Sequence, residues 1–279
     1  MSKPARDALA QLTPALLTEL AKSDATTLAI AGPPGSGKST LARLLAHLLT
    51  ASGKTTTVLS LDDYYFSHSQ RMQLAQDLHP LLQTRGVPGT HDWDALLHDF
   101  DCLRTGQIHG LLLPVFNKSV DDVEPRSRWR PVEAGPDYLI VEGWCIGAPA
   151  QAGPELEEAV NELESDEDPL TTWRQYVNRC LALYYSSLRQ RVGQFWYLSV
   201  PDWDCVIDWR WQQEQELPRP LLASREETRR FLATFERIIR HMQATSRHWA
   251  DCRLETDSSH CLHTDLHTGL HYGMPSGAT

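Results

Sequence analysis

The stretch that most constrains this chain is residues 28–41, which read LAIAGPPGSGKSTL. The fixed positions of the phosphate-binding pattern G-x-x-x-x-G-K-[ST] are occupied by Gly32, Gly37, Lys38 and Ser39. An apolar run at 27–31 precedes the pattern, and leucines recur at helical spacing after it. Because the pattern needs a strand before it and a helix after it, this context predicts a nucleotide-binding loop.

The residue types of this loop suit phosphate chemistry. Glycines let backbone N–H groups approach phosphate oxygens, and the helix starting near Lys38 directs the positive end of its dipole at the same anion. We expect Lys38 to contact the β- and γ-phosphates and the Ser39 hydroxyl to bind Mg²⁺, so the expected cofactors are ATP and Mg²⁺. The expected phosphate cradle is Gly32, Pro33, Pro34, Gly35, Ser36, Gly37, Lys38, Ser39 and Thr40. The alternative is a Gly/Pro-rich turn that precedes a helix by chance.

Carboxylates follow two further predicted strands. Asp62 and Asp63 come after the strand predicted at 55–61, and Glu142 follows the one predicted at 138–141. Ligands of open parallel sheets bind beyond the carboxyl ends of the strands. Asp62 is therefore placed to accept a proton from a substrate hydroxyl, and Glu142 to hold Mg²⁺. The alternative for Asp62 is a cap on the next helix.

Two loops between these elements carry further polar groups. A helical pattern at 71–83 leads to the first loop, which holds Arg85, His91 and Asp92, and Asp94 is expected to cap a helix at 95–103. The second loop contains Asn117-Lys118, but Val120 stands where the guanine-recognition pattern N-K-x-D needs an aspartate. The residues expected on the acceptor side are Asp63, Tyr65, Arg85, His91, Asp92 and Lys118.

The last third of the chain predicts two more strands and a helical pair. The strands lie at 194–200 and 249–256, and the first helix of the pair carries Arg210. Ser224 and Glu227 have the spacing of a capping box, which starts the second helix. Kinases close such helices over the phosphates, and Arg210, Arg219 and Arg225 flank the break between the two helices. Of these we expect Arg210 to act in catalysis with Asp62 and Lys38, and the alternative is that all three are ordinary surface arginines. The predicted fold is α/β: a three-layer P-loop NTPase fold with a mostly parallel five-stranded sheet, helices on both faces and a helical lid.

The composition of the chain restricts the classes of partner that it is expected to bind. The 279 residues carry a formal net charge of -10, which argues against nucleic acid and anionic membranes. No apolar run approaches the roughly 18 residues of a membrane span. The 6 cysteines form no C-x-x-C pair, which favours reduced thiols and a cytoplasmic location. The acidic stretch at 153–169 is typical of a solvated face, and the oligomeric state stays open.

The domain organisation is predicted from the same patterns. We expect one kinase-like domain over 1–257, with an acceptor-site insertion at about 66–135. Residues 258–279 contain the repeat LHTD-LHTG-LHYG and little other apolar content, which predicts a disordered His-rich tail.

Several motifs together resemble the plant-type D-glycerate 3-kinase family with its bacterial and fungal relatives, which is kin to the uridine kinase and phosphoribulokinase group. They are GPPGSGKST (32–40), LSLDDYY (59–65), HPLLQTRGVPGTHD (79–92), LPVFNKSVDD (113–122), VEGWCIG (141–147), ELESDEDPLTTWRQYVN (162–178) and WRWQQE (209–214). The resemblance covers about residues 13–257. It implies that Asp62 is the base, that Glu142 lies near Mg²⁺, and that Arg85, His91 and Lys118 face the acceptor. The chain departs from the family pattern at Asn117 and Val123.

The expected function is therefore an ATP-dependent kinase acting on a hydroxyl of a small, anionic metabolite, with D-glycerate as the first candidate. Two alternatives stay open: a kinase of a nucleoside, pantothenate or a sugar phosphate, and a nucleotide-binding regulatory protein. Asp62 at the end of a strand favours an enzyme over a sensor.

Overall fold

The computed structural model of the chain describes residues 15–216, 220, 222–258 and 262–264. At its centre lies a six-stranded sheet with the order β10-β9-β8-β1-β7-β2. Five of these strands run parallel, and the short β10 pairs antiparallel with β9 at one edge. The predicted α/β fold with a mostly parallel five-stranded sheet is confirmed. The strands are β1 (Thr27–Ala31), β2 (Thr56–Ser60), β7 (Tyr138–Gly143), β8 (Gln194–Ser199), β9 (Cys252–Thr256) and β10 (Leu262–Thr264).

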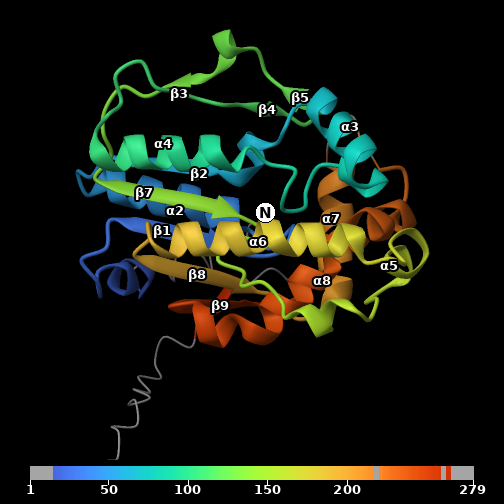
Figure 1. The fold of residues 1–279 in the computed structure, drawn as a ribbon. Coiled ribbons are helices and arrows are strands. Elements are labelled where there is room, and N and C mark those ends of the chain that lie inside the picture. The colour runs from blue at the N-terminus through green and yellow to red at the C-terminus, as the bar shows by residue number, and fades with distance from the viewer. Residues whose placement is uncertain (1–14, 217–219, 221, 259–261, 265–279) are drawn as a thin grey trace, which may run out of the picture.

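Helices cover both faces of the sheet because its central strands are apolar on both sides. Along β1, Leu28 and Ile30 join one hydrophobic cluster, while Ala29 and Ala31 join the other. The first cluster lies under α2 (Lys38–Ala51) and the helical residues 15–20. The second lies under α4 (Trp93–Thr105), α6 (Thr172–Arg189) and α8 (Arg225–Trp249). Figure 1 shows α4 and α6 in front of the sheet and α2 behind it.

Several of the remaining elements lie at the carboxyl ends of the parallel strands. There, α7 (Trp203–Gln215) packs against α8, and β2 runs directly into a one-turn 3₁₀ helix, η1 (Leu61–Tyr64). The segment between β2 and β7 holds α3, α4 and two small antiparallel strand pairs, which lie together at the top of Figure 1. The short elements are α3 (His68–Asp77), η2 (Pro80–Gln83), β3 (Leu112–Leu113), β4 (Phe116–Asn117), β5 (Asp122–Val123), η3 (Arg126–Arg128), β6 (Arg130–Pro131), η4 (Gly153–Leu156) and α5 (Glu162–Glu167).

The helices predicted on either side of the loop at 84–92 were wrong in detail. The helix predicted at 71–83 is split into α3 and η2, because Pro80 disfavours helical backbone at the residue before it. The cap of α4 is Asp92, not Asp94, because the Asp92 carboxylate accepts a hydrogen bond from Ala95 N at 3.1 Å. The helix consequently begins two residues earlier than predicted, at Trp93.

The acidic stretch at 153–169 is not a purely solvated face, which corrects that expectation. Glu164 and Asp168 are buried, with exposed fractions of 0% and 1%. Arg237 pairs with Glu164 at 2.6 Å, and Arg174 pairs with Asp168 at 3.4 Å. These buried ion pairs join α5, α6 and α8 into one unit beside the sheet.

The His-rich tail differs from its prediction where the structure describes it. Leu262–Thr264 forms β10, whose register pairs Leu262 with Thr256 and Thr264 with Leu254, so the prediction of disorder is wrong for these residues. Residues 265–279, with His267 and His271, lie outside the described part of the chain. Across the described ranges, none of the helices has the length and apolar character needed to span a membrane.

Candidate active site

The loop between β1 and α2 has the backbone shape that a phosphate cradle requires. Gly37 precedes α2 in the left-handed region with φ 92°, and Gly35 has φ 85°. A Cβ on Gly35 would also lie 2.8 Å from Cβ of Trp209, so only glycine lets α7 pack this closely on the loop. Lys38, the first residue of α2, lines the cavity in front of the loop.

Glu142 lies behind Ser39, which lines this cavity, and is held there by two hydroxyl groups. Its Oε1 accepts hydrogen bonds from Ser39 Oγ at 2.9 Å and Ser60 Oγ at 2.7 Å. Its Oε2 is buried and has no hydrogen-bond partner among the described residues. A carboxylate oxygen without a partner beside a serine hydroxyl matches the oxygen ligands that Mg²⁺ prefers, so these residues fit the metal that a P-loop requires.

Ser60 was missed by the sequence analysis, although the strand pairing makes its place clear. It is the last residue of β2 and stands opposite Glu142 in the parallel register of β2 and β7. A comparison of the two strand ends would have suggested the contact, because paired residues of adjacent strands lie side by side.

Asp62 stands on η1 and faces the phosphate loop. Its carboxylate accepts hydrogen bonds from Lys118 Nζ at 2.5 Å and from Tyr65 Oη at 3.0 Å. Burial raises the pKa of Asp62, but the charges of Lys118 and Lys38 and these hydrogen bonds lower it further, so the net pKa lies well below its usual range. The carboxylate is therefore ionised at neutral pH and able to accept a proton transiently.

Basic side chains converge on Asp62 in a cavity of about 280 Å³ between the phosphate loop, η1, α7 and α8. Five cationic side chains line this cavity, whereas Asp62 contributes the single carboxylate among its described lining residues. The five cationic side chains are Lys38, Arg43, Arg85, Lys118 and Arg210. Although the chain as a whole is acidic, this cavity favours anions.

Arg85 is fixed in the cavity wall by an aspartate that the sequence analysis passed over. Asp121 pairs with Arg85 and, at 2.8 Å, with the buried Arg71. The Asp121 backbone lies in the left-handed region with φ 56°, which is unusual for a residue other than glycine. The negative charge of Asp121 thus offsets only one of the two positive charges of Arg71 and Arg85, so these three side chains together keep a net positive charge. Nothing in the local sequence revealed this contact.

Arg210 reaches the cavity from α7, where the sequence placed it. Its guanidinium pairs with Glu214 at 2.6 Å, and Glu214 is completely buried. Phe231 and Phe235 of α8 and Trp144 complete the wall beside it. Trp144 Nε1 donates a hydrogen bond to Gly86 O at 2.7 Å, which ties the loop carrying Arg85 to the end of β7.

Only some of the residues expected on the acceptor side line this cavity. Tyr65, Arg85 and Lys118 line the cavity beside Asp62, and His91, Asp63 and Asp92 do not. Asp63 pairs with Arg130 at 3.2 Å, while Asp92 caps α4.

His91 lies behind Tyr65 and not in the cavity. A backbone bridge joins the two residues, and their rings stack with centroids 4.6 Å apart. His91 Nδ1 also lies 3.3 Å from Tyr184 Oη. Burial lowers the pKa of His91 to about 3 against an opposing effect of Asp62, so the ring stays neutral and supports Tyr65.

Comparison with known proteins finds kinases. The chain is 33% identical over 205 residues to the uncharacterized kinase mug58 of Schizosaccharomyces pombe, covering 68% of this chain and 70% of that protein. It is 31% identical over 201 residues to the probable ATP-dependent kinase TDA10 of Saccharomyces cerevisiae, covering 67% and 66%. It is 26% identical over 195 residues to the chloroplastic D-glycerate 3-kinase of Arabidopsis thaliana, covering 67% and 40%.

Among solved structures, a D-glycerate 3-kinase from Cryptococcus neoformans superposes with a TM-score of 0.72 at 22% identity, covering 91% of this chain and 97% of that one. At this identity the likeness concerns the fold. No protein-family model matches the chain.

Proposed function

Since this chain belongs to the P-loop family of small-molecule kinases, we propose that it transfers the γ-phosphate of ATP to a hydroxyl of a small hydroxy acid, with D-glycerate as the first candidate. The observation that carries the proposal is the convergence of basic side chains on the Asp62 carboxylate in front of the phosphate loop. The D-glycerate 3-kinase among the relatives supports the named acceptor.

The phosphate loop binds the triphosphate through its backbone N–H groups, the helix terminus and Lys38. Ser39 and Glu142 are the residues that would hold Mg²⁺, which neutralises charge on the phosphate oxygens when bound. Arg210 faces the same cavity from α7, and we assign it to the developing negative charge. Its ion pair with the buried Glu214 holds the guanidinium in place before nucleotide arrives.

Asp62 orients the acceptor and receives its proton. The acceptor oxygen forms a new bond to the γ-phosphorus while the bond from that phosphorus to the bridging oxygen of ADP breaks. The low pKa of Asp62 suits a loose transition state, in which little proton transfer is needed before the phosphorus–oxygen bond breaks.

Lys118 links the base to the acceptor. An ammonium group has three N–H donors, and one of them is used by Asp62. No other described residue accepts from this ammonium group, so its remaining donors can bind the carboxylate of a hydroxy acid, with Arg85 as the second cation on that wall. A carboxylate held there brings a hydroxyl of a short acid next to Asp62, and such positioning supplies much of the rate in phosphoryl transfer.

The test is ATP turnover by the purified full chain with D-glycerate, uridine, pantothenate and ribulose 5-phosphate as separate acceptors. We expect turnover with the hydroxy acid. Turnover only with neutral uridine would refute the acid acceptor and leave a nucleoside kinase. No turnover with any acceptor, despite tight ATP binding, would favour the regulatory protein.

Two variants test the assigned cations. Arg85→Ala and Lys118→Ala should raise KM for the acid by about 10-fold or more while KM for ATP changes little, because each removes a charge-assisted contact made to the acceptor. Arg128→Ala is the matched control, because Arg128 lies on the same inserted segment, its side chain is 70% exposed, and Glu124 is its one ion-pair partner among the described residues. Equal KM values for the acid in all three variants would refute the acceptor role of Arg85 and Lys118.

The cytoplasmic location stays a prediction.

A further inference from the structure

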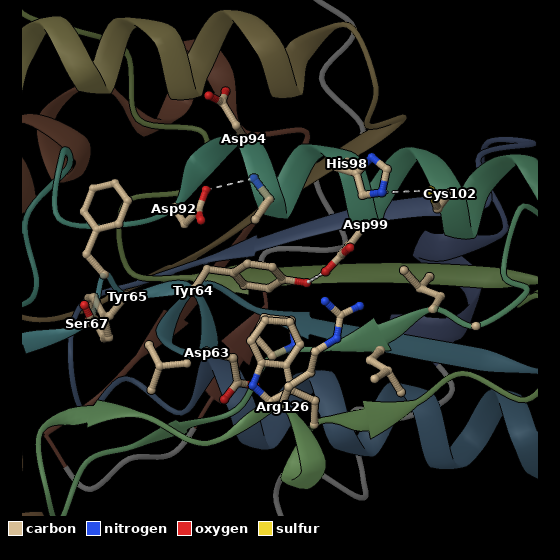
Figure 2. Close-up of a pocket in the computed structure, with 18 of the residues that line it drawn as sticks. Asp63, Tyr64, Tyr65, Ser67, Asp92, Asp94, His98, Asp99, Cys102 and Arg126 are labelled. Carbon is tan, nitrogen blue, oxygen red and sulfur yellow. Dashed lines mark hydrogen bonds between the residues drawn. The ribbon is translucent and has the colours of Figure 1, made fainter. Parts of the chain in front are cut away.

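A second, larger cavity of about 740 Å³ lies on the other side of η1, and nothing in the proposed reaction uses it. Figure 2 shows it between α4, η1 and the short strands of the inserted segment. Asp62 lines the phosphate cavity, whereas its neighbours Asp63 and Tyr64 line this one. Tyr65 is the one residue common to both linings. Cavities of several hundred Å³ with apolar walls and a few polar groups are typical of small-molecule sites.

The charge of the second cavity is opposite to that of the first. Four aspartates line it, and Arg126 is the one lysine or arginine in the lining. Two of the aspartates are already engaged: Asp63 pairs with Arg130, and Asp92 caps α4. Asp94 and Asp99 remain, and neither forms an ion pair with a described residue. An anionic ligand would be repelled here, and a cationic one attracted.

Asp99 is the most informative of these groups. It is only 6% exposed, and Tyr64 Oη donates a hydrogen bond to its Oδ2 at 2.8 Å. No described residue donates to its Oδ1. Figure 2 shows the carboxyl projecting from α4 into the cavity. Burial raises the pKa of Asp99, and the hydrogen bond from Tyr64 and the neighbouring His98 offset this rise only in part. Since Asp99 lines the cavity, this oxygen is free to accept a hydrogen bond from a ligand there.

The wall facing Asp99 is apolar and includes an aromatic ring. Leu111, Leu112 and Val123 belong to it, and the indole of Trp129 lies beside them. Trp129 Nε1 donates a hydrogen bond to Glu124 O at 2.8 Å, which fixes the ring. Arg126 lies over this ring with its guanidinium carbon 5.8 Å from the centroid. A ligand for this cavity therefore combines a hydrogen-bond donor with an apolar body.

We propose that this cavity binds a small organic amine, whose ammonium group pairs with Asp99 and whose apolar part lies against Leu112 and Trp129. An ammonium group supplies both the missing donor and the missing positive charge at Asp99. This proposal rests on the second cavity alone and is independent of which acceptor the kinase uses.

The test is isothermal titration of the full chain with tryptamine, whose indole suits the apolar wall. Tryptophol and indole-3-acetate are the matched ligands, since they place a neutral hydroxyl or a carboxylate near the position of the amine. Tryptamine should bind more tightly than either by about 10-fold or more. Saturating MgATP should leave its affinity unchanged, because the two linings have only Tyr65 in common.

Two variants test whether the ligand binds at Asp99. Asp99→Asn keeps an acceptor oxygen for Tyr64 and should weaken tryptamine about 10-fold or more, with thermal melting and ATP affinity checked in parallel. Asp77→Asn, at an exposed position of α3 outside both linings, is the control and should bind like the wild type. The proposal is overturned if tryptamine fails to bind at millimolar concentration, if tryptophol binds equally well, or if MgATP displaces tryptamine. An unchanged affinity in folded Asp99→Asn would overturn it as well.

Discussion

Replacing Glu142 with glutamine separates its proposed metal role from a structural one. The carboxylate is 4% exposed and forms no ion pair with a described residue, so its desolvation costs several kcal/mol. Hydrogen bonds from Ser39 and Ser60 offset this by about 1.5–3 kcal/mol each. In the absence of metal the charge on Glu142 therefore contributes a net free energy of folding close to zero.

Glutamine keeps the shape and one acceptor oxygen but lacks the charge. Its amide NH₂ group takes the position of the oxygen without a partner, at a cost of about 1–3 kcal/mol in place of the desolvation of a carboxylate. We expect the unliganded Tm of Glu142→Gln to stay within about 2–4 °C of the wild type, which corresponds to about 1 kcal/mol. The Mg²⁺ concentration that half-saturates ATP turnover should rise by about 10–100-fold, the usual effect of weakening a metal site.

Thermal melting without ligand and ATP turnover against Mg²⁺ concentration are the two measurements. Ser60→Ala is the control, since it removes one hydrogen bond and keeps the charge, and it should lower Tm more than it changes the Mg²⁺ dependence. A Glu142→Gln protein that needs no more Mg²⁺ than the wild type, or that melts many degrees lower, would refute the metal role and make Glu142 a structural residue.

Three further predictions address the base, the pH dependence of stability and the phosphate loop. Asp62→Asn should lower kcat by about 10²–10⁴-fold with little change in ATP affinity measured by calorimetry, because asparagine cannot accept the proton; loss of ATP binding instead would make Asp62 structural. His91 has a pKa of about 3 when folded and near 6.5 when unfolded, so the unfolded chain binds more protons between these values and stability rises with pH there. In urea unfolding, His91→Gln should remove a slope of about 1.4 kcal/mol per pH unit between about pH 4 and 5.5, and exposed His47→Gln should keep it. Gly35→Ala should cost about 1–3 kcal/mol and weaken ATP binding, because its Cβ would meet Cβ of Trp209 at 2.8 Å; an unchanged Tm and Kd would contradict this packing.

The parallel sheet was predictable because each strand has its own local signal. The runs that became β1, β2, β7 and β8 are rich in β-branched, aromatic or other apolar residues, and the phosphate-loop pattern fixes the first strand–helix unit. Asp62, Lys38 and Glu142 were found for the same reason, since strand ends of a parallel sheet meet at one edge. The nucleotide half of the candidate site is thus encoded locally.

The acceptor half depends on contacts between distant segments, which no local pattern records. Asp121 meets Arg85 across the inserted segment. The same holds outside the site, where Glu164 meets Arg237 at a sequence distance of 73 residues. In each case a charged residue that the sequence alone would place in solvent forms an ion pair with a residue of another segment. Arg210 was predictable only because kinase helices after the fourth strand commonly supply an arginine.

The separation of Asp62 from Asp63 shows most directly why sequence adjacency misleads here. The two residues are consecutive and chemically identical. If they are interpreted as part of a strand or a loop, both are assigned to the same site. The structure places them on a 3₁₀ helix, where about three residues complete one turn and consecutive side chains diverge by roughly 120°. Asp62 consequently meets Lys118 in the phosphate cavity, whereas Asp63 meets Arg130 at the second cavity. One turn of backbone thus gives the chain two cavities of opposite charge, so a ligand in one need not compete with a ligand in the other.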